Sequence, residues 1–214
     1  MTARACNARR QVHLLRMKTS ILAALCAPVL LLLALAVPAS AAPTKTETAI
    51  FAGGCFWCME HDMKMPGVLK VESGYTGGHL KNPRYRDVTS ETSGHYEAVR
   101  VTFDPAKLPY RFLLERYWKV VDPTDDGGQF CDRGPSYRPA VFVTPAQRAT
   151  AEASRAEAAK RLKRGTMKTP ILDAATFYVA EPYHRNYAKN NKVRYELYRA
   201  GCGRDARLTA VWGR

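Results

Sequence analysis

The chain has 214 residues, and its 33 lysines and arginines outnumber its 19 aspartates and glutamates, which gives a formal net charge of +14. This length is enough for one domain with a substantial hydrophobic core. A basic chain can bind nucleic acid, but here the basic residues are scattered or gathered on one helix, and no nucleic-acid-binding motif accompanies them. We therefore expect a solvated basic surface and no nucleic-acid partner.

The first 41 residues have the pattern of a secretory signal peptide. A start with five basic and no acidic residues is followed by an apolar run at 21–37 and by Ala39-Ser40-Ala41. The run has only 17 residues and contains Pro28, so we favour cleavage after Ala41 over a stable membrane anchor. Cleavage would remove the five basic residues and lower the net charge from +14 to +9.

The rest of the chain is predicted to form a linker at 42–47 and a single domain at 48–214. Apolar periodicity predicts the strands and helices, and Gly and Pro mark their ends. In chain order we predict a strand at 47–52, a helix at 55–66, strands at 68–73 and 96–103, a helix at 108–121, a strand at 140–144, a helix at 145–164, strands at 168–172 and 176–180, and a mixed tail from 183 with a short helix near Tyr187.

Two long segments between these elements, at 74–83 and 124–139, contain glycine pairs and are predicted to be loops. Loops of this length in a compact domain are often functional. Because strands and helices interleave without a regular βαβ repeat, the pattern indicates the α+β class.

The cysteines fall into two groups. Cys6 and Cys26 lie in the predicted leader, and the domain keeps Cys55, Cys58, Cys131 and Cys202. In an exported protein, four cysteines would usually indicate disulfides, but a domain of this size does not need them for stability. Cysteines with reactive neighbours therefore indicate redox chemistry.

The Cys55-Phe56-Trp57-Cys58 motif allows several interpretations. Haem attachment requires a histidine directly after the second cysteine, and Met59 stands there. A structural zinc site usually has two closely spaced ligand pairs, whereas Cys131 and Cys202 are each solitary. A thioredoxin-like thiol–disulfide oxidoreductase is the stronger alternative, because its nucleophile also follows a strand at the start of a helix.

A series of motifs along almost the whole domain resembles the A-type peptide-methionine sulfoxide reductase family, from about residue 48 to residue 213. The motifs are Gly54-Cys55-Phe56-Trp57, Gly74-Tyr75-Thr76-Gly77-Gly78, Gly94-His95-Tyr96-Glu97-Ala98-Val99, Asp122-Pro123-Thr124, Tyr137-Arg138 and Tyr183-His184. The resemblance implies a two-layer α+β sandwich, with a central mixed sheet, flanking helices, long active-site loops and an extended C-terminal tail. It also implies reduction of the S epimer of methionine sulfoxide, free or in proteins.

By this resemblance, Cys55 is the nucleophile that attacks the sulfoxide sulfur and becomes a sulfenic acid. Its predicted place at a helix N-terminus favours the thiolate, which is the attacking species. Glu97 matches the acid that protonates the departing oxygen, and a poorly solvated pocket would keep its carboxyl group protonated. The strand pattern alone would place Glu97 toward solvent; the surrounding motif reverses that interpretation.

The remaining residues implied by the resemblance shape the site. Tyr85 and Tyr137 match tyrosines that hydrogen-bond the sulfoxide oxygen, since a phenol stays neutral at pH 7 and donates one hydrogen bond. Asp132 matches an aspartate that helps to hold the site. Phe56 and Trp57 match the apolar pocket for the substrate methyl group.

A second thiol must resolve the sulfenic acid. Cys202, between two glycines in a tail expected to be mobile, matches the resolving cysteine of the family and ranks first. Cys58 ranks second, because a residue three positions along a helix lies on the same face. Cys131, in the loop that carries Asp132, ranks third.

The resemblance also sets the expected partners. No metal or organic cofactor is expected, and a thioredoxin-like dithiol would supply the electrons to a monomeric enzyme. The predicted signal peptide indicates an exported protein, which would be periplasmic in a Gram-negative cell.

Overall fold

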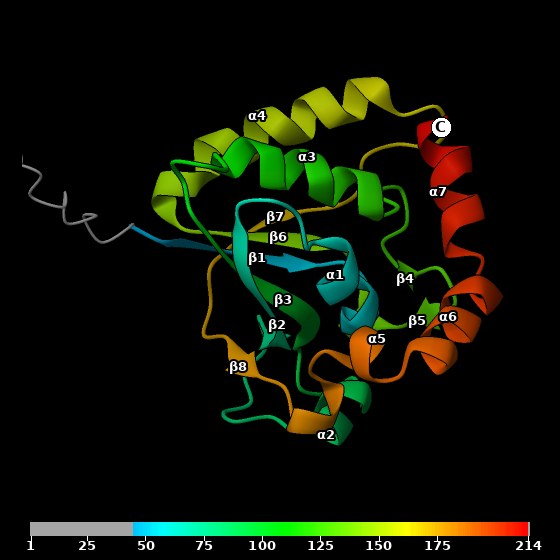
Figure 1. Cartoon of the computed structure of the whole chain (residues 1–214). Coiled ribbons are helices and arrows are strands. Elements are labelled where there is room, and N and C mark those ends of the chain that lie inside the picture. Colours follow the sequence, from blue (N-terminus) through cyan, green and yellow to red (C-terminus); the bar gives the residue numbers. More distant parts are fainter. Residues whose placement is uncertain (1–44, 214) are drawn as a thin grey trace, which may run out of the picture. The chain divides into compact units, whose positions relative to one another are not determined.

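The computed structural model describes residues 45–213, drawn in colour in Figure 1. The predicted signal peptide at 1–41 and most of the predicted linker therefore lie outside the described residues. The first strand begins at Glu47, one residue before the predicted domain boundary. Among the described helices, none combines the length and the apolar character that a membrane span requires.

A six-stranded mixed sheet forms the centre of the domain, with the strand order β7-β6-β1-β3-β2-β8. Its strands are β1 (Glu47–Ala52), β2 (Val68–Thr76), β3 (Tyr96–Phe103), β6 (Ala140–Val143), β7 (Ile171–Asp173) and β8 (Tyr178–Val179). Only β6 and β7 run parallel within this sheet, and every other neighbouring pair is antiparallel. All six predicted strands are present, although β7 and β8 are shorter than predicted.

The helices surround the sheet and the loops that follow it (Figure 1). They are α1 (Phe56–Asp62), α2 (Tyr85–Thr89), α3 (Tyr110–Val120), α4 (Pro145–Arg161), α5 (Tyr187–Asn190), α6 (Lys192–Gly201) and α7 (Arg204–Trp212). The longest of them, α4, begins with Pro145 after a capping box between Thr144 and Gln147, as expected at a helix start. Helix α3 runs beside α4, and α7 contacts α3.

The sheet has one face covered by helices, which holds the main core. Alternate residues of β3, namely Val99, Val101 and Phe103, are fully buried there with apolar residues of α1, α3 and α4. Side chains of this kind stabilise the fold by about 1.5–3 kcal/mol each when they are fully buried. A smaller cluster with Ala98 and Phe142 covers the other face. The two-layer α+β architecture implied by the resemblance is therefore confirmed.

Three segments have more regular structure than the sequence predicted. The first predicted loop begins as the end of β2, because the strand continues through Thr76. The second contains the two-stranded hairpin of β4 (Gly128–Gln129) and β5 (Asp132–Arg133), followed by the 3-10 helix η1 (Pro135–Tyr137). The tail is not extended: it folds into η2 (Pro182–His184) and α5 to α7, because those helices pack on α1, α3 and one another.

Candidate active site

Cys55 lies at the junction between the central strand β1 and helix α1, as its N-cap residue. Two glycines allow this junction. A side chain on Gly53 would collide with the sulfur of Met59, and Gly54 combines a φ of +77° with a close approach to Gln129. Such a positive φ is readily adopted by glycine alone. The tight turn places Cys55 below the surface, with 6% of its side chain exposed.

Glu97 is buried beside the start of α1. In β3 it is two residues before Val99, so it lies on the helix-covered face of the sheet rather than toward solvent. Its Oε2 atom accepts a hydrogen bond from the backbone N–H of Phe56 at 2.9 Å. Burial nevertheless dominates and raises the pKa of the Glu97 carboxyl to about 8, so that it is mostly protonated at pH 7. The structure therefore provides the protonated carboxyl group that the resemblance implied.

A small cavity of about 230 Å³ lies in front of Cys55. It is lined by Cys55, Phe56, Trp57, Tyr85, Glu97, Asp132, Tyr137 and Tyr198. The first seven are all the nucleophile, acid, tyrosine, aspartate and apolar-pocket residues predicted from the sequence. They come from α1, α2, β3, β5 and η1, and the fold brings them together.

Polar side chains line one part of this cavity. Burial raises the pKa of Tyr85 and of Tyr137, so both phenols are neutral donors at pH 7. Tyr85 is fixed by Glu181, whose Oε1 accepts its backbone N–H at 2.8 Å. Burial also raises the pKa of Asp132. A substrate oxygen in the cavity would meet the neutral hydroxyl groups of Tyr85 and Tyr137.

Tyr198 is a site residue that the sequence analysis missed. Its hydroxyl group donates a hydrogen bond to Asp132 Oδ2 and is also within hydrogen-bonding contact of Cys55. It lies on α6, in the tail that was predicted to be mixed. The two tyrosines Tyr195 and Tyr198, three apart in the sequence, were the available signal, because that spacing puts both rings on one helix face.

The apolar part of the cavity is held rigid by stacked rings. Trp57 stacks on Tyr187 of α5, with ring centroids 3.7 Å apart, and its indole N–H donates to Nδ1 of His184 at 3.1 Å. Phe56 packs against the same histidine at 5.0 Å. These contacts fix the two aromatic walls that a methyl group would touch.

Cys55 and Cys58 form a hydrogen-bonded pair of free thiols, both buried. Burial raises the pKa of Cys55 well above its usual value, and Cys58 and Glu97 raise it further. The hydrogen bond from Cys55 lowers the pKa of Cys58 to about 7, with help from the charge of Arg204 and the hydroxyl group of Tyr195. The pKa of Cys55 is therefore raised, whereas its place at a helix N-terminus predicted a lowered pKa. The reason is that α1 is short and that Cys55 is almost fully desolvated beside Glu97 and the Cys58 thiol.

The other two cysteines, Cys131 and Cys202, form a disulfide across 71 residues of sequence. Cys202 caps the C-terminus of α6, so it is held in folded structure rather than in the mobile tail that we expected. Cys58 is therefore the thiol in contact with Cys55, and Cys202 is already bonded elsewhere.

The zinc alternative would require the four cysteines to surround one ion. Within residues 45–213, one group of three metal-ligand-type side chains comes close enough together to be considered, and it comprises Cys131, Asp132 and Cys202. Its two sulfur atoms are bonded to each other. The cysteines thus form two separate redox pairs and not one ligand set.

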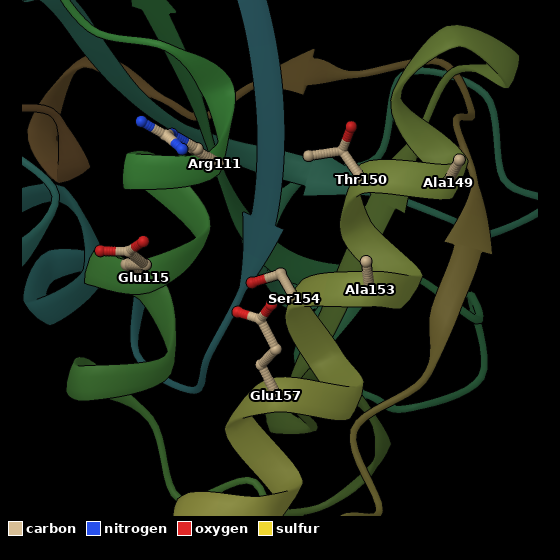
Figure 2. A pocket seen from close by; sticks show the side chains of 7 residues that line it. All are labelled: Arg111, Glu115, Ala149, Thr150, Ala153, Ser154 and Glu157. Carbon is tan, nitrogen blue, oxygen red and sulfur yellow. The ribbon is translucent and has the colours of Figure 1, made fainter.

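A larger cavity of about 440 Å³ lies between α3 and α4 (Figure 2). Figure 2 shows that its lining side chains, such as Arg111, Glu115 and Glu157, come from these two helices alone. None of its lining residues is a cysteine, histidine or tyrosine. The thiol, carboxyl and phenol groups that can carry out a reaction therefore line the smaller cavity at Cys55.

The smaller cavity combines two thiols, which can supply two electrons, with a protonated carboxyl group and neutral phenols, which can receive and protonate an oxygen atom. Proteins with this combination are cysteine-dependent oxidoreductases that act on a small oxygen-bearing group.

Comparison with known proteins agrees and is more specific. The model of the peptide methionine sulfoxide reductase family matches residues 47–214, and the chain belongs to that family, as a member of its A type. Peptide methionine sulfoxide reductase MsrA 2 of Caulobacter vibrioides is 79% identical over 188 residues, which cover 87% of this chain and 95% of that protein. MsrA of Bacillus licheniformis is 53% identical over 173 residues, covering 79% of this chain and 96% of that one.

Solved structures show the same fold. Methionine sulfoxide reductase A of Corynebacterium diphtheriae superposes with a TM-score of 0.62 and 28% identity, over 71% of this chain and 77% of that one. The reduced form of Mxr1 from Saccharomyces cerevisiae has a TM-score of 0.66 and 25% identity, over 71% of this chain and 88% of that one.

Proposed function

We propose that the protein reduces methionine S-sulfoxide, free or in proteins, to methionine and thereby repairs oxidised proteins. The observation that carries this proposal is the protonated carboxyl group of Glu97 beside the Cys55 thiol, in a cavity walled by Phe56 and Trp57. A sulfoxide has an oxygen that must be protonated and a methyl group that needs an apolar wall. The cavity offers both on adjacent sides.

In the first step, the sulfur of Cys55 attacks the sulfoxide sulfur. The proton of the Cys55 thiol passes to the Glu97 carboxylate and replaces the proton that Glu97 gives to the substrate oxygen. Glu97 protonates the sulfoxide oxygen, which Tyr85 and Tyr137 also bind. The oxygen passes to the Cys55 sulfur, while the S–O bond of the substrate and its temporary bond to Cys55 both break. Methionine is released, and Cys55 becomes a sulfenic acid.

In the second step, Cys58 resolves the sulfenic acid. Its sulfur attacks Cys55, an S–S bond forms, and the oxygen leaves as water after accepting the Cys58 proton. One sulfoxide and two thiols thus give one thioether, one disulfide and one water. Contact between Cys55 and Cys58 supports this role, whereas Cys202, which the sequence ranked first, is bonded to Cys131.

In the last step, a thioredoxin-like dithiol protein restores the two thiols by thiol–disulfide exchange. This partner is proposed because the catalytic disulfide needs two electrons from outside the enzyme. Cys131 and Cys202 would then serve either as a relay for these electrons or as a structural disulfide, and the two roles predict different mutant behaviour.

The deciding experiment measures methionine formation from the separated sulfoxide epimers. Wild type, Cys55→Ser, Cys58→Ser and Cys202→Ser would be compared in single turnover without reductant and in steady state with thioredoxin. We expect reaction with the S epimer alone and none with Cys55→Ser. Cys58→Ser and Cys202→Ser should each complete one turnover, and Cys58→Ser should accumulate the sulfenic acid.

The outcomes separate the alternatives. If Cys202→Ser also keeps steady-state turnover, the Cys131–Cys202 disulfide is structural; if it loses recycling alone, that pair is a relay. Failure of the wild type to reduce either epimer would contradict the proposed function. Insulin-disulfide reduction that depends on Cys55 and Cys58 would then support a thiol–disulfide oxidoreductase, and stoichiometric bound zinc would support a metal module.

We also propose that the protein is exported, and periplasmic if the cell is Gram-negative, with its leader cleaved near Ala41. The basic start, apolar run and Ala39-Ser40-Ala41 sequence support this location. Cell fractionation with N-terminal sequencing of the purified protein tests it. An uncleaved protein found only in the cytosol would contradict the proposal.

A further inference from the structure

A buried arginine lies directly behind the reactive cysteine pair. Arg204 is the first residue of α7, two positions after Cys202, and only 2% of it is exposed. Arginine is almost never fully buried without a partner, because taking a charged group out of water is strongly unfavourable. The location also opposes the helix dipole, which disfavours a cation at a helix N-terminus. Both effects are unfavourable, so the buried guanidinium of Arg204 is expected to have a specific role at this position.

The contacts of the Arg204 guanidinium direct it toward α1. It donates to the backbone carbonyl of Val120, lies 3.8 Å from the sulfur of Met59, and stacks under the ring of Phe130 at 4.4 Å. Its Nε atom is 3.4 Å from Oδ2 of Asp62. Because Cys58 and Asp62 are four residues apart on α1, they share one helix face, and Arg204 faces it.

Asp62 does not fully compensate the charge of Arg204. Both carboxylate oxygens of Asp62 accept hydrogen bonds from Arg199 at 2.9 Å. The Nε–H of Arg204 has no hydrogen-bond partner in the described structure, although it is completely buried. A buried donor left in this way is destabilising unless a further anion compensates it. The anion available on the same face of α1 is the Cys58 thiolate.

Groups from four elements face Cys58, and some of them lower its pKa while others raise it. Cys55 and Tyr195 donate hydrogen bonds that favour its ionised form, and the charge of Arg204 does the same. Burial and the negative charge of Asp62 oppose ionisation. Ionised Cys58 in turn disfavours ionisation of Glu97 on β3. Arg204 is the one cation in this set.

We propose that Arg204 is a positioning residue for the resolving step: its buried guanidinium stabilises the Cys58 thiolate and keeps that sulfur ready to attack the oxidised Cys55. The proposal rests on the proposed function, because it concerns the step after methionine is released. It also links the two cysteine pairs. Cys131 follows Phe130 and Cys202 precedes Gly203, so their disulfide ties together the segments that enclose the guanidinium.

The test compares Arg204→Met, which removes the charge but keeps much of the volume, with Arg204→Lys, which keeps the charge. Arg207→Met is the matched control. Arg207 lies on the same helix and pairs with the buried Asp122 at 2.6 Å, but it is not among the groups that act on Cys58. Each variant would be mixed with methionine S-sulfoxide for one turnover. Released methionine, trapped sulfenic acid and remaining free thiols would be followed in time.

We expect Arg204→Met to release methionine as the wild type does, but to keep its sulfenic acid about fivefold longer at pH 7, since a rise of about one unit from a pKa near 7 lowers the thiolate fraction roughly fivefold. Arg204→Lys should restore most of the rate, and Arg207→Met should behave as the wild type. In a Cys55→Ala background, which removes the contribution of Cys55, titration of the thiolate absorbance should place ionisation of Cys58 about one pH unit higher with Arg204→Met than with Arg204 present.

An unchanged sulfenic acid lifetime and an unchanged titration in folded Arg204→Met would overturn the inference and leave Arg204 a purely structural residue. If Arg204→Met does not fold, the same comparison is made with Arg204→Gln, and an unchanged sulfenic acid lifetime and titration there also overturn the inference. Absence of methionine release from the wild type would instead contradict the proposed function, so the two failures are distinguishable.

Discussion

The two cysteine pairs of this protein differ in every property that governs thiol chemistry. Cys55 and Cys58 are three residues apart on one short helix, fully enclosed, and present as thiols. Cys131 and Cys202 are 71 residues apart, partly exposed, and joined in a disulfide. The first pair lies beside a proton donor, whereas the second connects a hairpin to the end of α6.

This difference teaches that the surroundings of a cysteine, and not its spacing, assign its role. Enclosure raises the pKa of Cys55 and Glu97 together, which keeps the proton where a sulfoxide oxygen will need it. The partly exposed pair instead closes a long loop and is open to a protein reductant. If the two roles are separable, substitutions at one pair should leave the function of the other intact.

Glu97→Gln should have the largest effect on chemistry. Glutamine keeps the acceptor for the Phe56 N–H but cannot donate a proton to the sulfoxide oxygen. Loss of a general acid lowers rates by about 10²–10⁴-fold, and we expect single-turnover methionine formation to fall by that amount. In the wild type the rate should also decline above about pH 8, where Glu97 loses its proton. A full rate in Glu97→Gln would show that the acid lies elsewhere.

Opening the Cys131–Cys202 disulfide should affect stability more than the first chemical step. In the chain-entropy account, a crosslink over a loop of this length stabilises a protein by about 4 kcal/mol. Urea unfolding of Cys131→Ser/Cys202→Ser should reveal a loss of this order, while single-turnover methionine formation is retained. Cys58→Ala, which breaks no crosslink, is the control and should cost about 1 kcal/mol. Equal losses in both would remove the distinction between the pairs.

Glu97 should also make the protein less stable as the pH rises. Its pKa is about 8 in the folded state and near 4.5 when unfolded. Below pH 4.5 both states are protonated, and between pH 4.5 and 8 only the unfolded state ionises, so stability falls through this window and then stays constant. Glu97→Gln does not titrate and should gain stability relative to the wild type across the same range. Parallel pH–stability curves would contradict the raised pKa.

Apolar periodicity predicted the strands, whereas the resemblance to a known family predicted seven of the eight residues that line the cavity. In β3, Glu97 alternates with the apolar residues Val99, Val101 and Phe103, so the period of the strand itself places Glu97 on the helix-covered face. Arg204 and Tyr198 were missed because α6 and α7 are polar helices whose positions depend on packing against α1. A buried arginine cannot be identified from composition, since arginine is usually exposed. Tertiary contacts, not local patterns, decide these positions.

Tyr198→Phe should have the smallest effect and tests the link between the pairs. The substitution removes the hydroxyl group that donates to Asp132 and contacts Cys55, but keeps the ring against Trp57. Loss of one such hydrogen bond costs about 1 kcal/mol, which corresponds to roughly a fivefold lower rate of methionine formation. The control is Tyr183→Phe, because Tyr183 is 64% exposed and does not line the cavity. If both variants react at the wild-type rate, the hydroxyl group of Tyr198 takes no part in the reaction. Helix α6, which the Cys131–Cys202 disulfide anchors, would then contribute packing alone.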